Sequence, residues 1–139
     1  MAIDRDSNSK RFFQVRNARN TEIAEDYTEM IADLINENGE ARSVDLAERF
    51  GVTSPTVNSI IRRLVREGLV ESKPYRSIFL TEEGKVLASF CKKRHEIVYK
   101  FLLAIGVKDE IAKIDAEGLE HHVSKETLKV FENFILKNK

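Results

Sequence analysis

Residues 43–62 are SVDLAERFGVTSPTVNSIIR, two short helical patterns on either side of a glycine. Ala47 is small enough to let two helices cross closely, and Gly51 supplies the permissive backbone of a tight turn. Val57 is placed to pack the second helix onto the first. This spacing predicts a helix-turn-helix, whose second helix enters the major groove of DNA. A helical hairpin used for protein contacts is the alternative.

Three helices are predicted in this part of the chain. Apolar residues recur at helical spacing over residues 23–35, and Asn38-Gly39 is a typical helix end. A second helix is expected over residues 43–50, with Ser43 as its cap. The third is expected to begin at Ser54-Pro55, because serine caps helices and proline suits the first helical position.

A β-hairpin and further helices follow. Residues 69–72 and 77–80 predict two short strands joined by a proline turn. The order helix, helix, helix, hairpin is the winged-helix arrangement. Thr81 is a plausible cap for a long helix with one apolar stripe, and shorter helices are expected from about Asp109 and from Ser124.

Charge is segregated along the chain, although the formal net charge is zero. Residues 1–20 contain five basic and two acidic residues, and residues 21–50 contain nine acidic and two basic ones. Residues 54–80 again carry five basic residues against two acidic. The predicted DNA-binding segment is therefore locally basic. Residues 1–20 show no periodicity and are expected to be a flexible arm.

The cysteine count and the hydropathy indicate the compartment. Cys91 is the only cysteine, which excludes an intrachain disulfide and fits a reducing environment. The sequence has no secretion signal and no apolar stretch of the length that a membrane span needs. We expect a soluble cytoplasmic protein.

The DNA contacts are predicted from the docking of such motifs. The first turns of the second helix meet bases or phosphates, and later arginines and the wing meet phosphates. A solvated surface charge is the alternative for each basic residue. The predicted DNA-binding residues are Ser54, Pro55, Thr56, Asn58, Ser59, Arg62, Arg63, Lys73 and Arg76.

A second constellation consists of metal-ligand side chains. Six donors are Asp26, Glu29, His95, Glu117, Glu120 and His121. Those on one helix stand three or four residues apart and so share a face. Taken singly, each carboxylate is typical of a solvated helix face, and His95 is typical of a core histidine whose hydrogen bonds are made within the protein. Together they suit manganese or ferrous iron better than a metal that prefers thiolates. Cys91 is interpreted as core filler.

Four motifs carry a family resemblance: EDYTE at 25–29, the helix-turn-helix, RHE at 94–96 and EGLEHH at 117–122. With them the chain resembles the manganese-transport regulators of the diphtheria toxin repressor family, over roughly residues 22–137. The resemblance implies a homodimer on a palindromic double-stranded operator. It also implies two divalent ions per subunit, held by the six donors at the junction of two domains.

The resemblance also favours one metal. Iron-sensing relatives carry a thioether at the position of Asp26 and a thiol at that of Glu117, so the two carboxylates here favour Mn²⁺, with Fe²⁺ as the other candidate. The chain is further expected to lack the additional C-terminal domain of the iron sensors.

We therefore expect a mainly α protein with a flexible arm at 1–20, a winged helix-turn-helix domain at 21–80 and a helical metal-binding and dimerisation domain at 81–139. The expected function is a manganese-responsive repressor of metal-transport genes, with no membrane partner and no organic ligand. The alternatives are an iron-responsive member of the family, a winged-helix regulator with a non-metal ligand, and a two-metal hydrolase. The hydrolase would need an open pocket and a metal-bound water.

Overall fold

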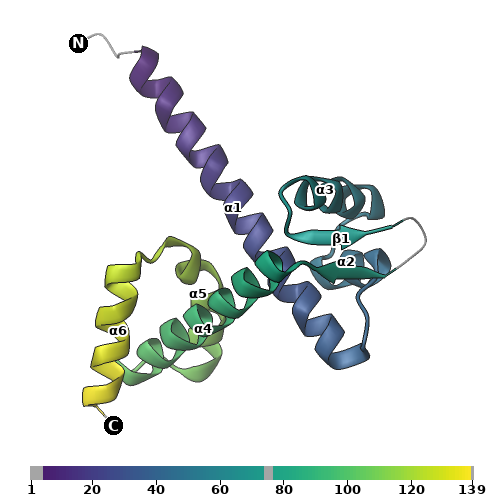
Figure 1. Ribbon diagram of the computed structural model, residues 1–139. Helices are drawn as coiled ribbons and strands as arrows, with labels where there is room; N and C mark the ends of the chain where they lie inside the picture. Colours follow the sequence, from purple (N-terminus) through teal and green to yellow (C-terminus); the bar gives the residue numbers. More distant parts are fainter. Residues whose placement is uncertain (1–4, 74–76, 139) are drawn as a thin grey trace. The chain divides into compact units, whose positions relative to one another are not determined.

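The computed structural model describes residues 5–73 and 77–138, and its contacts divide the chain into two compact units that meet between Ala88 and Ser89. The fold is mainly helical, and the predicted order of three helices, a hairpin and further helices is confirmed (Figure 1). The elements are α1 (Arg5–Asn38), α2 (Ser43–Phe50), α3 (Ser54–Arg66), β1 (Val70–Ser72), β2 (Ile78–Leu80), α4 (Glu82–Ala104), α5 (Asp109–Leu119), the 3₁₀ turn η1 (Glu120–His122) and α6 (Lys125–Lys137).

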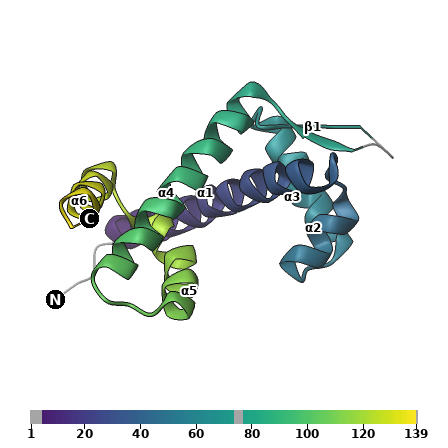
Figure 2. The same cartoon turned by 90° about the horizontal axis from the view of Figure 1, so that it is seen from below.

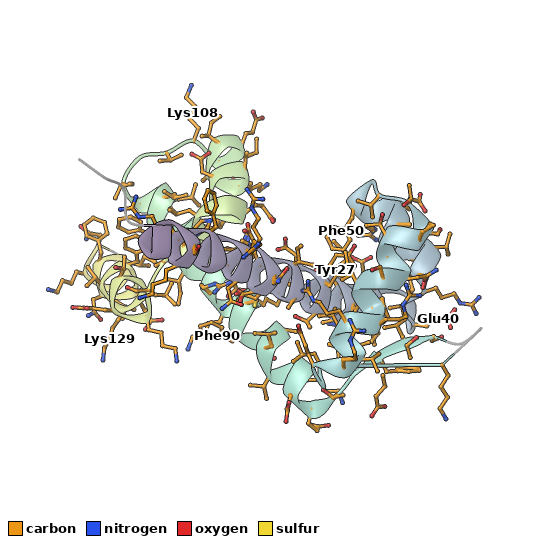
Figure 3. The ribbon with its side chains drawn as sticks, turned by 90° about the horizontal axis from the view of Figure 1, so that it is seen from above. Tyr27, Glu40, Phe50, Phe90, Lys108 and Lys129 are labelled. Carbon is orange, nitrogen blue, oxygen red and sulfur yellow. The ribbon has the colours of Figure 1, made fainter. Side chains whose placement is uncertain are left out.

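The core of the first unit lies among α1, α2, α3 and the hairpin. Ile31, Leu46 and Val57 are fully buried there, as the apolar spacing of their helices requires. The ring of Tyr27 on α1 stacks on that of Phe50 at the end of α2, with centroids 4.5 Å apart (Figure 3). These contacts fix the helix-turn-helix against α1.

The turn between α2 and α3 has the backbone that its glycine predicts. Gly51 has φ +65°, in the left-handed region, and its N–H donates to the Glu48 carbonyl at 3.3 Å.

Two of the predicted helix caps are wrong by one residue. Thr53, and not Ser54, caps α3, because its hydroxyl accepts from the Thr56 N–H.

Ser43 is likewise the first residue of α2 and not its cap. The cap position belongs to Arg42, whose side chain makes no capping hydrogen bond. A single-residue shift of this kind is not resolved by sequence pattern, because the pattern locates a helix end only to within one or two residues.

The hairpin is antiparallel, with Val70 opposite Leu80 and Ser72 opposite Ile78. Its base is attached to the helices by an antiparallel bridge between Ala41 and Ile78. The start of β2 therefore pairs with the segment that connects α1 to α2. Figure 2 shows the two strands extending beyond α2 and α3 as a wing. The predicted turn at 74–76 lies outside the described residues.

The first helix differs from expectation at its start. We expected no regular structure before about residue 20, but α1 begins at Arg5. Periodicity reveals a helix only through a buried face, and residues 9–12 and 16–20 are exposed. No glycine or proline interrupts residues 1–38, so a helix nucleated by the packed part extends by propagation alone.

The second unit packs the later part of α4 against α5 and α6. Val98, Ala112 and Ala116 are fully buried, and the rings of Phe101 and Phe131 stack with centroids 3.8 Å apart. The predicted cap of α6 is confirmed, since the Ser124 hydroxyl accepts from the Thr127 N–H at 3.1 Å. Among the described helices, none joins the length and apolar character that a bilayer crossing needs.

Candidate metal centre and DNA-binding surface

The predicted recognition residues of α3 lie on its surface. Ser54, Pro55, Asn58 and Ser59 are exposed, as is Arg62 two turns after the start of the helix. The face opposite them carries Val57, Ile61 and Leu64 into the core. The helix therefore presents a polar stripe of small side chains, which suits close approach to base edges and phosphates.

Two of the predicted DNA contacts are engaged within the first unit. The Thr56 hydroxyl lies 2.8 Å from the hydroxyl of the cap residue Thr53. The Arg63 guanidinium donates to the side-chain and backbone oxygens of Asn20 on α1, at 3.2 and 2.9 Å. Arg63 thus joins α3 to α1. On the wing, Lys73 is exposed, and Arg76 lies outside the described residues.

Asp26 and Glu29 lie on α1 in the first unit and are half-buried. The spacing of three residues places both on one side of the helix. Next to them, burial and then the charge of Asp26 raise the pKa of the Tyr27 hydroxyl. The carboxylates thus lie at the border of the packed face of α1, as their place beside its apolar stripe predicted.

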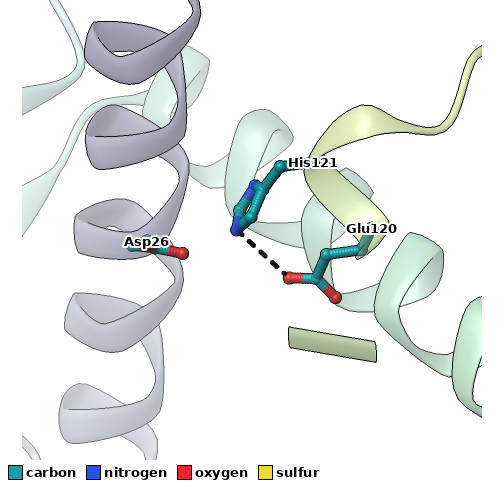
Figure 4. A group of neighbouring side chains, drawn as sticks. All are labelled: Asp26, Glu120 and His121. Atoms are coloured by element: carbon teal, nitrogen blue, oxygen red, sulfur yellow. Dashed lines mark ion pairs between the residues drawn. The ribbon is translucent and has the colours of Figure 1, made fainter. Parts of the chain in front are cut away.

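The cluster of metal-ligand side chains in the second unit is centred on Glu120. This residue is only 1% exposed, although its side chain is a carboxylate. Its Oε2 lies 2.6 Å from Nδ1 of His95 on α4. Its Oε1 lies 3.7 Å from Nε2 of His121, the ion pair drawn in Figure 4. The 3₁₀ turn η1 directs the Glu120 and His121 side chains inward. Glu117 is exposed on α5, one turn earlier in the chain.

Arg94 joins this cluster, and sequence reasoning missed it. It is 6% exposed, and a guanidinium nitrogen lies 3.3 Å from Nδ1 of His121. The guanidinium also lies 5.4 Å from the centre of the Phe90 ring and 3.9 Å from the Cys91 sulfur. The available signal was the spacing of Arg94 in the sequence. It follows Cys91 by three residues and Phe90 by four, and both belong to the apolar stripe of α4. Cys91 is fully buried, which agrees with its interpretation as a core residue.

The donor set fits a divalent cation of the manganese type. A carboxylate held out of water costs several kcal/mol unless charged or donor groups compensate it. Glu120 meets this need with an imidazole at each oxygen. Carboxylate and imidazole are the ligands that manganese and ferrous iron take, and a carboxylate hydrogen-bonded to one imidazole nitrogen orients the other toward a metal.

The contact with Arg94 fixes the tautomer of His121. An arginine donating to Nδ1 of His121 makes that nitrogen an acceptor, so Nε2 bears the proton toward Glu120. Metal binding at Nε2 would require this proton to move to Nδ1, because the metal ligand is a neutral imidazole.

Known proteins match both halves of the chain. Residues 20–78 match the family described as iron dependent repressor, N-terminal DNA binding domain, and residues 81–139 match its metal binding and dimerisation domain. The chain is 50% identical over 136 residues to the transcriptional regulator MntR of Escherichia coli O157:H7, covering 98% of this chain and 88% of that protein. It is 54% identical over 127 residues to MntR of Escherichia coli O6:H1, covering 91% and 82%.

A solved structure has the same fold. It is described as a manganese-dependent transcriptional repressor complex with manganese, and it matches with a TM-score of 0.71 at 28% identity. The match covers 81% of this chain and 52% of that one, so the present chain spans about half the length of that protein. Identity, coverage and fold agree. The chain therefore belongs to the MntR branch of the diphtheria toxin repressor family, and it is a DNA-binding transcriptional regulator rather than an enzyme.

Proposed function

We propose that this regulator represses metal-transport genes in response to manganese, which it binds through Asp26, Glu29, His95, Glu117, Glu120 and His121. The observation that carries the proposal is Glu120, a buried carboxylate with an imidazole at each oxygen. A manganese ion supplies positive charge that offsets the repulsion among the carboxylates. The identity of the relatives supports manganese, because MntR proteins and a manganese-dependent repressor are among them.

The ligands come from both units, and this distribution suggests how metal and DNA are coupled. Asp26 and Glu29 belong to α1, whose neighbour α3 carries the recognition residues, and the other four donors belong to the second unit. Binding all six donors to one pair of ions would tie the DNA-binding unit to the second unit. The affinities for metal and for DNA are then reciprocally linked, typically by about 1–3 kcal/mol.

The operator follows from the oligomeric state that we propose. A homodimer presents two copies of α3, which read two half-sites about 34 Å apart or a multiple of that distance. The operator is then palindromic. The match to a dimerisation domain over residues 81–139 supports this arrangement.

The test uses metal-stripped protein and a fluorescently labelled duplex selected from a random-sequence pool by the manganese-loaded protein. Anisotropy is followed with and without manganese at fixed salt, because phosphate contacts make affinity salt-dependent. Manganese is expected to tighten binding tenfold or more, about 1.4 kcal/mol. Calorimetric titration of manganese is expected to give two ions per subunit.

Matched variants separate the site from general charge effects. Glu120→Gln keeps the shape and removes the negative charge, so it should abolish the gain from manganese. Glu126→Gln, an exposed carboxyl on α6, should leave that gain unchanged. Equal DNA affinity of the wild-type protein with and without manganese would contradict the proposal. A parallel titration with ferrous iron under anaerobic conditions decides between the two metals.

A further inference from the structure

The start of α1 is a basic helical segment. Residues 9–20, which we call the basic segment, contain Lys10, Arg11, Arg16 and Arg19 and no acidic residue. All four cations are exposed. Among the side chains that the structure describes, no carboxylate forms an ion pair with any of them. Like charges one turn apart repel each other, so the segment is suited to a polyanion.

The basic segment is attached to the recognition helix. Asn20, its last residue, accepts two hydrogen bonds from Arg63 of α3, at 3.2 and 2.9 Å. Arg63 lies seven residues after Thr56 and four after Ser59, so the three share one stripe of α3. The stripe that carries predicted DNA contacts therefore ends at the residue that holds α1.

Helical spacing places part of the charge on the side of α1 that Arg63 contacts. Arg16 is four residues before Asn20 and lies about 40° round the helix from it, whereas Arg19, its sequence neighbour, lies about 100° round. Lys10 and Arg11 lie about 80° and 180° round the helix from Asn20, but they stand about 14–15 Å before it along the axis, against about 6 Å for Arg16. The N-terminal half of α1 projects beyond the helices and the wing of the first unit (Figure 1), and both Arg16 and Arg19 are exposed.

We propose that Arg16 and Arg19 bind backbone phosphates next to the bases that α3 reads, so that the basic segment extends the protein's contact with DNA. The proposal rests on the function proposed above, because α3 must first enter the groove. About 17 Å of helix separates residue 9 from residue 20, at about 1.5 Å per residue, which is long enough to pass the rim of the groove. DNA offers about one phosphate charge per 1.7 Å of its axis, so several phosphates lie within this reach.

The test compares two double variants that remove equal charge. Arg16→Gln with Arg19→Gln is compared with Lys10→Gln with Arg11→Gln, both loaded with manganese. The probes are the selected duplex and the same duplex extended by about one helical turn, ten base pairs, at each end. Each phosphate contact adds about 0.9 to the slope of log affinity against log salt concentration. We expect the Arg16 and Arg19 variant to lower this slope by about 1.8 per subunit, and the control variant to lower it by less than half as much.

The outcomes are distinct. The longer duplex should bind the wild-type protein more tightly than the selected duplex, and the Arg16 and Arg19 variant should lose that preference. An unchanged slope overturns the proposal and would favour an acidic protein as the partner of the segment. An equal loss in the control variant also overturns it, because the charge of the whole segment, and not Arg16 and Arg19, would then act on DNA. The ratio of affinities with and without manganese should stay unchanged in both variants. If the wild-type protein binds DNA regardless of manganese, the proposed function fails, while the comparison of slopes still decides the role of the basic segment.

Discussion

Gly84 lets the backbone of α4 approach the backbone that precedes β1. A Cβ atom added there would lie 2.1 Å from the carbonyl oxygen of Leu69, which no side-chain rearrangement relieves. The Gly84 N–H donates to the Thr81 hydroxyl at 3.1 Å, and that hydroxyl donates to the Gly68 carbonyl at 2.7 Å. The wing and the long helix thus meet at a position that only glycine fits.

Gly84→Ala is therefore expected to lower the free energy of unfolding by about 1–3 kcal/mol, the usual cost of an overpacked site. The measurement is urea denaturation followed by circular dichroism. Gly118→Ala is the control, because an added Cβ there meets nothing within 4 Å and the residue lies in α5. That change should be neutral or stabilising by up to about 1 kcal/mol. Equal effects of the two substitutions would contradict the role of Gly84.

The need of His95 for a partner could be predicted from the pattern of one helix. His95 within an apolar stripe required a partner, and the structure supplies Glu120 at 2.6 Å. Its role as a metal ligand stays a prediction. Arg94 was missed, because its contact with His121 joins residues 27 positions apart, and no local spacing encodes such a pair.

A carboxylate beside the Ala41–Ile78 bridge adds a second attachment at the base of the wing. Glu40, just after α1, accepts a hydrogen bond from the Ser77 hydroxyl at 2.8 Å and one from Arg42 at 2.9 Å. The bond from Ser77, followed by the bond and the charge of Arg42, lowers the pKa of Glu40. The folded state therefore binds this proton less readily than the unfolded chain does.

This shift predicts a pH-dependent contribution to stability. The contribution is fully present above the pKa of the unfolded chain, about 4.3, and is lost as pH falls through the lower pKa of the folded state. Glu40→Gln should lower the melting temperature at pH 7, and the difference from wild type should shrink below about pH 4. Glu71→Gln, which neutralises an exposed carboxyl on β1, is the control. A difference that stays constant with pH would contradict this account.

Whole elements were predicted more accurately than their ends. The turn glycine and the capping residues Thr81 and Ser124 have local hydrogen-bond signatures, and these were confirmed. The first seventeen residues of α1 before Glu22 were not predicted as helix, because an exposed helix has no apolar face for a periodicity to reveal. The start of α1 is stable because it continues a helix that is packed further along the chain. The sequence pattern of this segment alone does not reveal that continuity.

At the scale of the molecule, the second unit carries exposed apolar side chains. Ile111 and Ile114, three residues apart on α5, are 50% and 70% exposed. Exposed apolar side chains that adjoin on one helix face are a candidate for a contact between subunits. In the proposed homodimer we expect α5 to lie against the partner subunit.

Ile114→Glu is accordingly expected to shift the protein from dimer to monomer in sedimentation experiments, because it places a charge in an apolar interface. Val44→Glu is the matched control, since Val44 is 63% exposed on α2 in the other unit. The control should remain a dimer. A dimeric Ile114→Glu protein would show that α5 is not the interface.

The boundary between the two units falls inside α4, after Ala88 in a helix that runs from Glu82 to Ala104. The modules therefore do not share a loop at which an insertion or a genetic crossover is easily tolerated. A recombination event at this boundary would replace half of a helix, whose two parts must then keep the same register.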